Sequence, residues 1–165
     1  MTGFYEPELM VQFLQHAHRR IDGHLTDFRD ALEVGEPDWA LLEEAKEELL
    51  QHMYAEEVLV FPALQEELPD AIAQLLDEHG QIWDLMSALD EAVATGADLS
   101  YLFQALSALL AALAAHSSEE DFGIYPELLA RLGPERTLQL LEEAERLRPP
   151  PGWVCSARAG QGRAG

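Results

Sequence analysis

Four long stretches of the chain carry apolar residues at intervals that alternate between three and four, the spacing of an inward-facing stripe on a bundled α-helix. These stretches cover residues 7–32, 38–68, 71–94 and 99–132, and each is followed within a few residues by Gly or Pro. Gly and Pro just past the last periodic residue are helix stop signals. Loops this short make consecutive helices antiparallel neighbours, so the sequence predicts an all-α, up-down-up-down four-helix bundle.

The remainder of the chain adds less to the predicted fold. Residues 134–148 have the pattern of a shorter, fifth amphipathic helix, and residues 149–165 are rich in Pro, Gly, Ala and Arg. That composition predicts a flexible tail with at most local packing by Trp153. A chain of 165 residues can bury one hydrophobic core. We therefore expect one domain over residues 1–148, with its core in residues 7–132, followed by the tail.

Charge and cysteine content restrict the function and the compartment. The net charge of -21 disfavours nucleic acid and anionic lipid as partners. The single cysteine, Cys155, excludes an intramolecular disulfide and fits a reducing compartment. The N-terminus lacks the basic and apolar parts of a signal peptide, and the longest apolar run, residues 106–115, is too short to span a bilayer. We expect a cytoplasmic protein, and nothing in the sequence indicates its oligomeric state.

The apolar stripes are interrupted by six polar residues, which are His18, His52, Glu56, His79, His116 and Glu120. A buried carboxylate without a partner costs several kcal/mol or more, so a Glu on such a stripe must be paired or bound to a metal. Counting from the loops at about 1.5 Å per residue places all six residues in one slab of the core. A metal site explains this coincidence better than a passive core, although a hydrogen-bonded His/Glu network is the structural alternative.

The two glutamates belong to an internal repeat with the pattern H-x3-E-[ED]-x3-[FY]-P, which starts at His52 and again at His116. A His and a Glu four residues apart lie on one helix face and can reach one ion. Carboxylates can bridge two metals, whereas each imidazole binds one. The expected arrangement has His18 and His52 on one metal, His79 and His116 on the other, and Glu56 and Glu120 as bridges. This donor set favours iron, with manganese or zinc as alternatives.

Other polar and aromatic residues near the repeat receive secondary roles. Glu57 and Asp121 are expected either to face solvent or to accept hydrogen bonds from ligand imidazoles, and Asp22 is a further candidate for the second role. His16 and His24 lie off the stripe of the first helix and are expected at the surface or behind the ligands, with an extra metal ligand from one of them as the alternative. The aromatic residues near these positions are interpreted as packing groups; they are Tyr54, Phe61, Trp83 and Tyr125.

Taken in order, these pieces resemble the hemerythrin-like (HHE cation-binding) family over roughly residues 10–130. The matching pieces are His18-Arg-Arg-Ile21, the repeat from His52 to Pro62, Glu78-His79-Gly-Gln-Ile82, and the repeat from His116 to Pro126. The combination is specific, whereas each piece alone is weak. The resemblance implies a non-haem pair of iron ions, oxo- or hydroxo-bridged, that meets O2 or, in some branches, nitric oxide or peroxide.

One departure from the family pattern bears on function. Oxygen-carrying hemerythrins place two His one turn apart on the third helix, whereas here Leu75 and Trp83 flank His79. Four rather than five imidazoles leave more open coordination, which favours redox chemistry, sensing or metal handling over simple O2 carriage. The main hypothesis is a di-iron protein that binds, senses or reacts with O2, nitric oxide or peroxide. The alternatives are an oxidoreductase that consumes peroxide or nitric oxide and a metal-storage or structural bundle.

Overall fold

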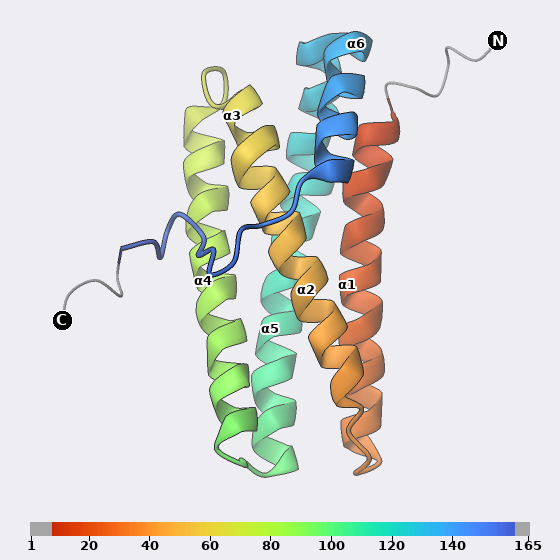
Figure 1. Ribbon diagram of the computed structural model, residues 1–165, viewed down its shortest axis with the longest axis vertical. Helices are drawn as coiled ribbons and strands as arrows, with labels where there is room; N and C mark the ends of the chain where they lie inside the picture. Colours follow the sequence, from red (N-terminus) through yellow and green to blue (C-terminus); the bar gives the residue numbers. More distant parts are fainter. Residues whose placement is uncertain (1–7, 161–165) are drawn as a thin grey trace.

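A computed structural model describes residues 8–160, and all regular structure in that range is helical. Four long helices lie side by side: α1 (Leu9–Glu33), α2 (Trp39–Ala55), α4 (Pro69–Ala94) and α5 (Leu99–Glu119) (Figure 1). Two of them are extended by further helical turns, α2 by η1 (Glu56–Val60) and α3 (Phe61–Leu64), and α5 by η2 (Glu120–Ile124) and α6 (Tyr125–Arg146). The expected helical bundle is confirmed; the expected start of its first helix, residue 7, lies outside the described residues.

The turns at one end of the bundle show why these helices begin and end where they do. The Asp38 carboxylate accepts a hydrogen bond from the Ala40 backbone N–H, and the Asp98 carboxylate accepts one from the Tyr101 N–H at 2.8 Å. Such caps satisfy backbone donors that a helix start leaves free. Two residues after the preceding helices end, Gly35 and Gly96 have φ values of 75° and 71°, in the left-handed region that glycine enters without strain.

Two π-helical turns, η1 and η2, each begin at a glutamate of the internal repeat. In η1 the Phe61 N–H donates to the Glu56 carbonyl, and in η2 the Tyr125 N–H donates to the Glu120 carbonyl, so one extra residue is accommodated in each turn. A proline follows each turn, at position 62 or 126. Proline lacks an N–H and its ring clashes with the carbonyl four residues earlier, which widens the preceding turn. The repeat therefore has the same backbone irregularity in both halves.

The core consists of two apolar clusters that lie above and below a polar slab. One cluster fills the end with the α1–α2 and α4–α5 turns and includes Phe28, Leu49 and Leu106. The other fills the opposite end and includes Leu14, Val60 and Leu128. Burying such side chains stabilises the fold by about 1.5–3 kcal/mol each. Along every long helix, the polar stripe residues occupy the interval between these two clusters, so apolar packing at both ends holds them in place.

Helix α6 contains a kink at Gly133, where φ is 77° and ψ is 172°, immediately before Pro134. Beyond the kink the chain folds back beside the top of the bundle (Figure 1). Its buried residues Leu140, Leu141 and Ala144 join the same apolar cluster as Leu14. Helical structure is expected over residues 134–148, and the helix ends at Arg146.

Judged by length and composition only, the helical stretch from Leu99 to Arg146 is apolar enough to cross a membrane. Core helices of bundles pass the same test.

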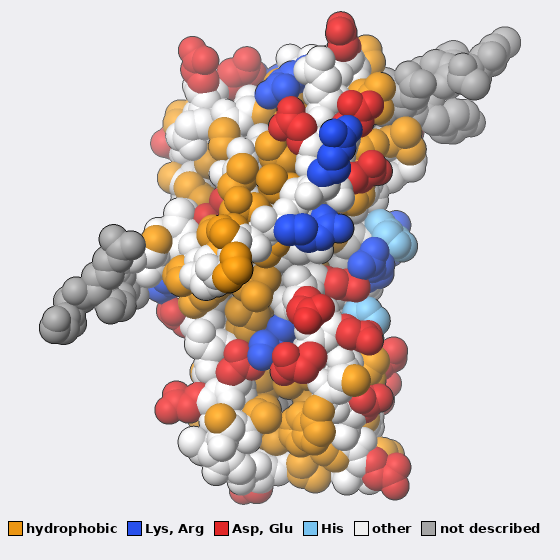
Figure 2. All heavy atoms as spheres, in the orientation of Figure 1, with side chains coloured by type: hydrophobic (Ala, Val, Ile, Leu, Met, Phe, Trp, Pro, Cys, Tyr) orange, Lys and Arg blue, Asp and Glu red, His pale blue; other side chains and the backbone are white. Residues whose placement is uncertain are grey.

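The segment after α6 packs against the bundle along residues 149–160, where the composition predicts flexibility. It crosses α2 and runs toward α4 (Figure 1), in a region where hydrophobic side chains gather on this face (Figure 2). Trp153 packs edge-on against Tyr54 and Trp83, Cys155 is fully buried, and the Arg158 guanidinium pairs with Asp84 at 2.8 Å. The composition does not reveal this order because a few individual side chains produce it. Residues 161–165 lie outside the described residues.

Candidate metal centre

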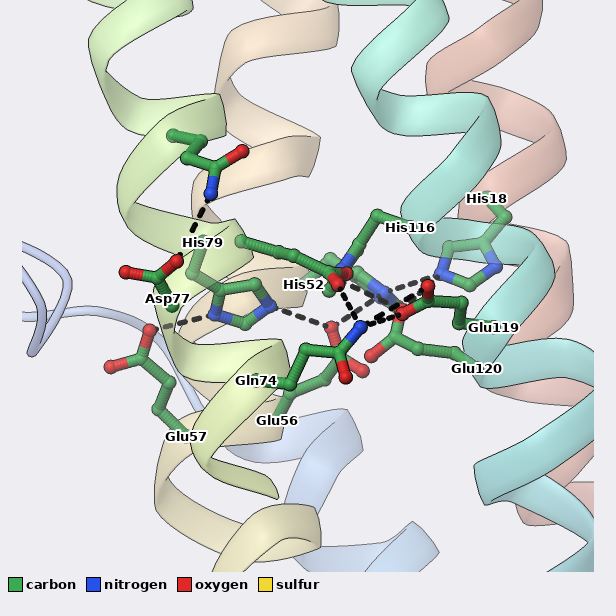
Figure 3. A network of polar contacts seen from close by, with 12 residues as sticks. His18, His52, Glu56, Glu57, Gln74, Asp77, His79, His116, Glu119 and Glu120 are labelled. Atoms are coloured by element: carbon green, nitrogen blue, oxygen red, sulfur yellow. Dashed lines mark hydrogen bonds and ion pairs between the residues drawn. The ribbon is translucent and has the colours of Figure 1, made fainter. Parts of the chain in front are cut away.

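The six polar stripe residues converge at mid-height in the bundle, where the side chains from four helices point toward one another (Figure 3). Glu56, His79 and Glu120 are fully buried, and His52 and His116 are 6% and 5% exposed. His18 is the least covered of the six, although its side chain is only 8% exposed. All six predicted ligands are therefore together in one place, in the slab that helix register indicated.

One set of donor atoms comes from His18, His52 and Glu120, whose nearest ligand atoms lie within 4.8 Å of one another. The Nε2 atoms of the two imidazoles are 2.9 Å apart. Glu120 Oε1 lies 3.1 Å from His18 Nε2. Two imidazole nitrogens and a carboxylate oxygen that face a common point are an arrangement suited to a transition-metal ion.

A second set comes from Glu56, His79, His116 and Glu120, also within 4.8 Å of one another. His116 Nε2 lies 3.2 Å from Glu120 Oε1, and His79 Nε2 lies 3.5 Å from Glu56 Oε1. Glu120 thus belongs to both sets. Glu56 also reaches the first set, since its Oε1 is 3.0 Å from His52 Nε2. The imidazoles thus fall into the pairs His18–His52 and His79–His116, and both carboxylates lie between the pairs.

Four atoms at the centre of this cluster test whether a metal fits. Glu56 Oε1, Glu120 Oε2, His79 Nε2 and His116 Nε2 are buried and have no hydrogen-bond partner among the described residues. Leaving a buried donor or acceptor unpaired costs about 1–3 kcal/mol per group. A closed hydrogen-bonded network would not leave these atoms free. Cations placed between them would satisfy all four, so the donor set fits metal ions.

Carboxylates behind three of the imidazoles fix the direction in which the Nε2 atoms point. His18 Nδ1 lies 3.1 Å from Asp121, and His79 Nδ1 lies 2.7 Å from Glu57. An ionised carboxylate only accepts hydrogen bonds, so each Nδ1 donates and each Nε2 is directed into the centre. Of the two alternatives expected for Glu57 and Asp121, the structure shows the acceptor role. Asp22, the other candidate, borders a cavity beside the centre, while Asp121 holds His18.

The third such carboxylate, Glu78, was missed by the sequence interpretation. Its Oε1 accepts a hydrogen bond from His116 Nδ1 at 2.7 Å, and its Oε2 accepts one from Gln74 at 3.0 Å. Glu78 directly precedes a predicted ligand, His79, but it accepts its hydrogen bond from His116 on the neighbouring helix. The sequence feature that could have indicated this role is its position next to a predicted ligand.

The charges of the centre follow from burial opposed by close ion pairs. Burial disfavours imidazolium, but the nearby carboxylates of Glu56 and Glu57 raise the pKa of His79 to about 9. Burial also disfavours the charged form of His116, but the nearby carboxylates, Glu120 above all, raise the pKa of His116 to about 10. Burial opposes ionisation of Glu56, but His52 and other hydrogen-bond partners hold its pKa well below the ordinary value. Without a metal, protons on His79 and His116 balance the buried carboxylates.

A further polar atom at the centre, the hydroxyl of Tyr125, was also missed, because this residue was interpreted as a packing group. The Tyr125 side chain is fully buried. Its hydroxyl donates to Glu56 Oε2 at 3.1 Å and lies 3.1 Å from His18 Nε2. Burial and the nearby carboxylates raise the pKa of Tyr125 well above its ordinary value. The sequence feature that could have predicted this role is the last variable position of the repeat, where Phe61 is replaced by Tyr125. A tyrosine hydroxyl buried at that position needs a polar partner.

The other two histidines of α1, which are not among the six predicted ligands, lie away from the centre. His16 is exposed. His24 faces the acidic side of α2, with its ring nitrogens 3.7 Å from Glu44 and 3.5 Å from Glu48. Neither belongs to the two donor sets.

A cavity of about 290 Å³ opens beside the centre, and its lining includes His18, His52 and His116. Its other walls are largely apolar and include Ile21, Leu49, Met53, Ile82 and Leu113. An apolar cavity that ends on candidate metal ligands suits a small uncharged molecule.

The C-terminal segment also reaches the ligands, through Glu57. The Ser156 backbone N–H donates to Glu57 Oε1 at 2.9 Å, while Oε2 of the same carboxylate binds His79. Burial opposes ionisation of Glu57, but these hydrogen bonds lower its pKa overall. The segment therefore helps to orient a ligand imidazole.

Comparison with known proteins agrees with this geometry. The family model described as the hemerythrin HHE cation binding domain matches residues 9–128, which contain all six candidate ligands. No curated protein matches the chain. No solved structure matches it.

Proposed function

Because the chain belongs to the hemerythrin HHE cation-binding family, we propose that it holds two iron ions at this centre and that a small neutral molecule meets them there. The observation that carries the proposal is the position of Glu120, which belongs to both donor sets. A carboxylate shared by two sets of imidazoles is suited to bridge two ions. The four unpartnered buried atoms support the same proposal.

The proposed ligands would act in two ways. His18 and His52 would hold one ion and His79 and His116 the other, while Glu56 and Glu120 bridge the pair. Asp121, Glu57 and Glu78 keep three of the imidazoles turned inward by accepting their Nδ1–H. Iron at such a site supplies reversible one-electron chemistry toward O2, nitric oxide or peroxide. Manganese or zinc would fit the same donors, and metal analysis distinguishes them.

The cavity supports the proposed class of ligand. Its walls are largely apolar, although Arg19 and Asp22 also line it, and would admit a small uncharged molecule. Leu75, one turn before His79, is buried in an apolar cluster, so this position provides no fifth imidazole. The coordination position on the metal that a fifth imidazole would fill is therefore left for an exogenous ligand or water. This feature favours a second candidate function, the consumption of peroxide or nitric oxide, over simple O2 carriage.

The proposal is tested with protein loaded with ferrous iron under anaerobic conditions and then oxidised. Azide and nitric oxide should each change its absorption spectrum in a saturable way. Leu113→Phe, which narrows the cavity, should slow ligand binding and leave the iron content unchanged. A spectrum that neither ligand alters contradicts the proposal. Peroxide or nitric oxide consumption no faster than that of free iron would favour binding or sensing over the enzyme.

A further inference from the structure

The two halves of the internal repeat differ at one buried position, which is Phe61 in the first half and Tyr125 in the second. Both residues follow a π-helical turn, and both are almost completely buried, at 2% and 0% exposed. Each ring lies against an imidazole of the centre, Phe61 against His79 and Tyr125 against His18, with centroids 5.2 and 5.6 Å apart. The two side chains at this repeat position differ in one atom, because only Tyr125 has a hydroxyl oxygen.

That oxygen has the spacing of a ligand within a coordination sphere. It lies 3.1 Å from His18 Nε2, 3.4 Å from His52 Nε2 and 3.1 Å from Glu56 Oε2. Bonds of about 2.1 Å from an ion to N and O donors place neighbouring ligands of a six-coordinate ion about 3 Å apart. The hydroxyl thus faces the same point as the two imidazoles, at the distances expected of a fourth donor beside them.

We infer that Tyr125 is a further metal ligand, which binds through its phenolate oxygen to the ion held by His18 and His52. The inference rests on the proposed two-iron centre. On binding, the phenol O–H bond breaks, the oxygen forms the bond to the metal, and the proton leaves to solvent together with those displaced from the imidazoles. No electron is transferred in this step.

Phenolate ligation would make the two halves of the centre unequal. The ion beside Tyr125 gains an anionic oxygen ligand, which stabilises the ferric over the ferrous state because it offsets the larger positive charge. The other ion has no such ligand, because the equivalent position is the apolar ring of Phe61. A centre of this kind would suit redox chemistry better than reversible O2 carriage.

The test compares oxidised, iron-loaded wild-type protein with Tyr125→Phe, using Tyr101→Phe as the control. Tyr101 is exposed at the start of α5, about 22 Å along the helix from His116 at 1.5 Å per residue. Wild type and the control should show a phenolate-to-iron charge-transfer band in the visible region. Tyr125→Phe should lose the band and retain its iron, since Phe61 shows that this environment accommodates a phenylalanine.

Resonance Raman spectroscopy of the wild type provides a test that needs no variant. Excitation in the visible band should enhance phenolate ring modes that shift when the protein contains ring-deuterated tyrosine. Two bound irons without these modes, or a band that persists in Tyr125→Phe, would overturn the inference and leave the proposed centre standing. Wild-type protein that binds no iron would overturn the proposed centre itself and this ligand with it.

Discussion

The Nε2 atoms of His18 and His52 face each other across 2.9 Å, although 34 residues separate them in the chain. The His18 Nδ1–H is directed to Asp121, so the neutral His18 ring presents a lone pair at Nε2. A metal ion between the two rings would accept the lone pairs of both Nε2 atoms, which makes this pair a starting point for ion binding.

Glu78→Gln should weaken metal binding without removing a ligand. The substitution keeps a hydrogen-bond acceptor for His116 Nδ1 but removes the negative charge that raises the basicity of this imidazole. Loss of such outer partners lowers metal affinity by roughly 10- to 100-fold. Competition with a coloured chelator measures the affinity, and Glu66→Gln, at an exposed position before α4, is the control. Equal affinities for the two variants would show that Glu78 does not act through His116.

Most of the fold and all six candidate ligands could be predicted from the sequence, because both depend on which face of a helix a residue occupies. His18 and Glu120 were identified in this way, by position on a stripe and by depth. Contacts between side chains on different helices depend on how each helix is rotated about its axis and on its axial position to within a few ångströms. The sequence pattern does not specify either quantity that finely. Glu78 and the Tyr125 hydroxyl were missed for that reason, and the packing of Trp153 depends on a path that composition does not specify.

The metal-free protein should lose stability as the pH rises above neutrality. In the folded state the pKa values of His79 and His116 are raised to about 9 and about 10 from an ordinary 6.5. A raised pKa stabilises the fold fully below the ordinary value, and this contribution disappears as the pH passes through the raised one. Chelator-treated protein should therefore melt several degrees lower at pH 10 than at pH 7.

Two controls identify the groups responsible for this pH dependence. His116→Gln should flatten the dependence in the metal-free protein, because it removes one of the titrating groups. Metal-loaded protein should also show a flatter profile, because bound imidazoles carry no extra proton. A melting temperature of wild-type metal-free protein that stays constant or rises over this range would contradict the assigned protonation.

Gly80→Ala should release the C-terminal segment from α4. A Cβ at position 80 would lie 2.7 Å from Arg158 Nη1 and 2.9 Å from the Ala157 Cβ, so the segment must move. Cys155 belongs to this segment, is fully buried where the segment packs on the bundle, and is the chain's single cysteine. Its reaction with a thiol reagent should become several-fold faster in this variant. Gly23→Ala, where a Cβ meets nothing within 4 Å, should react at the wild-type rate. Equal rates in all three proteins would contradict this packing.

Glu120→Gln should lower metal binding at both positions, because both donor sets share this carboxylate. Glu56→Gln should likewise lower binding at both positions, because Glu56 is the second proposed bridge and its Oε1 lies 3.0 Å from His52 Nε2 and 3.5 Å from His79 Nε2. Both variants should remain folded, as checked by circular dichroism, and Glu91→Gln, exposed on α4, is the control for charge. Metal analysis after gel filtration gives the occupancy. Full occupancy in both variants would favour a hydrogen-bonded network over metal ligation by these carboxylates.

The most direct test of the central claim is an anaerobic titration of metal-free protein with ferrous iron, followed by the heat released and by iron analysis. The two overlapping donor sets predict tight binding that ends at two equivalents per chain, with proton release from His79 and His116. A titration that ends at one equivalent, or one in which no iron binds, would contradict a two-metal centre in this bundle.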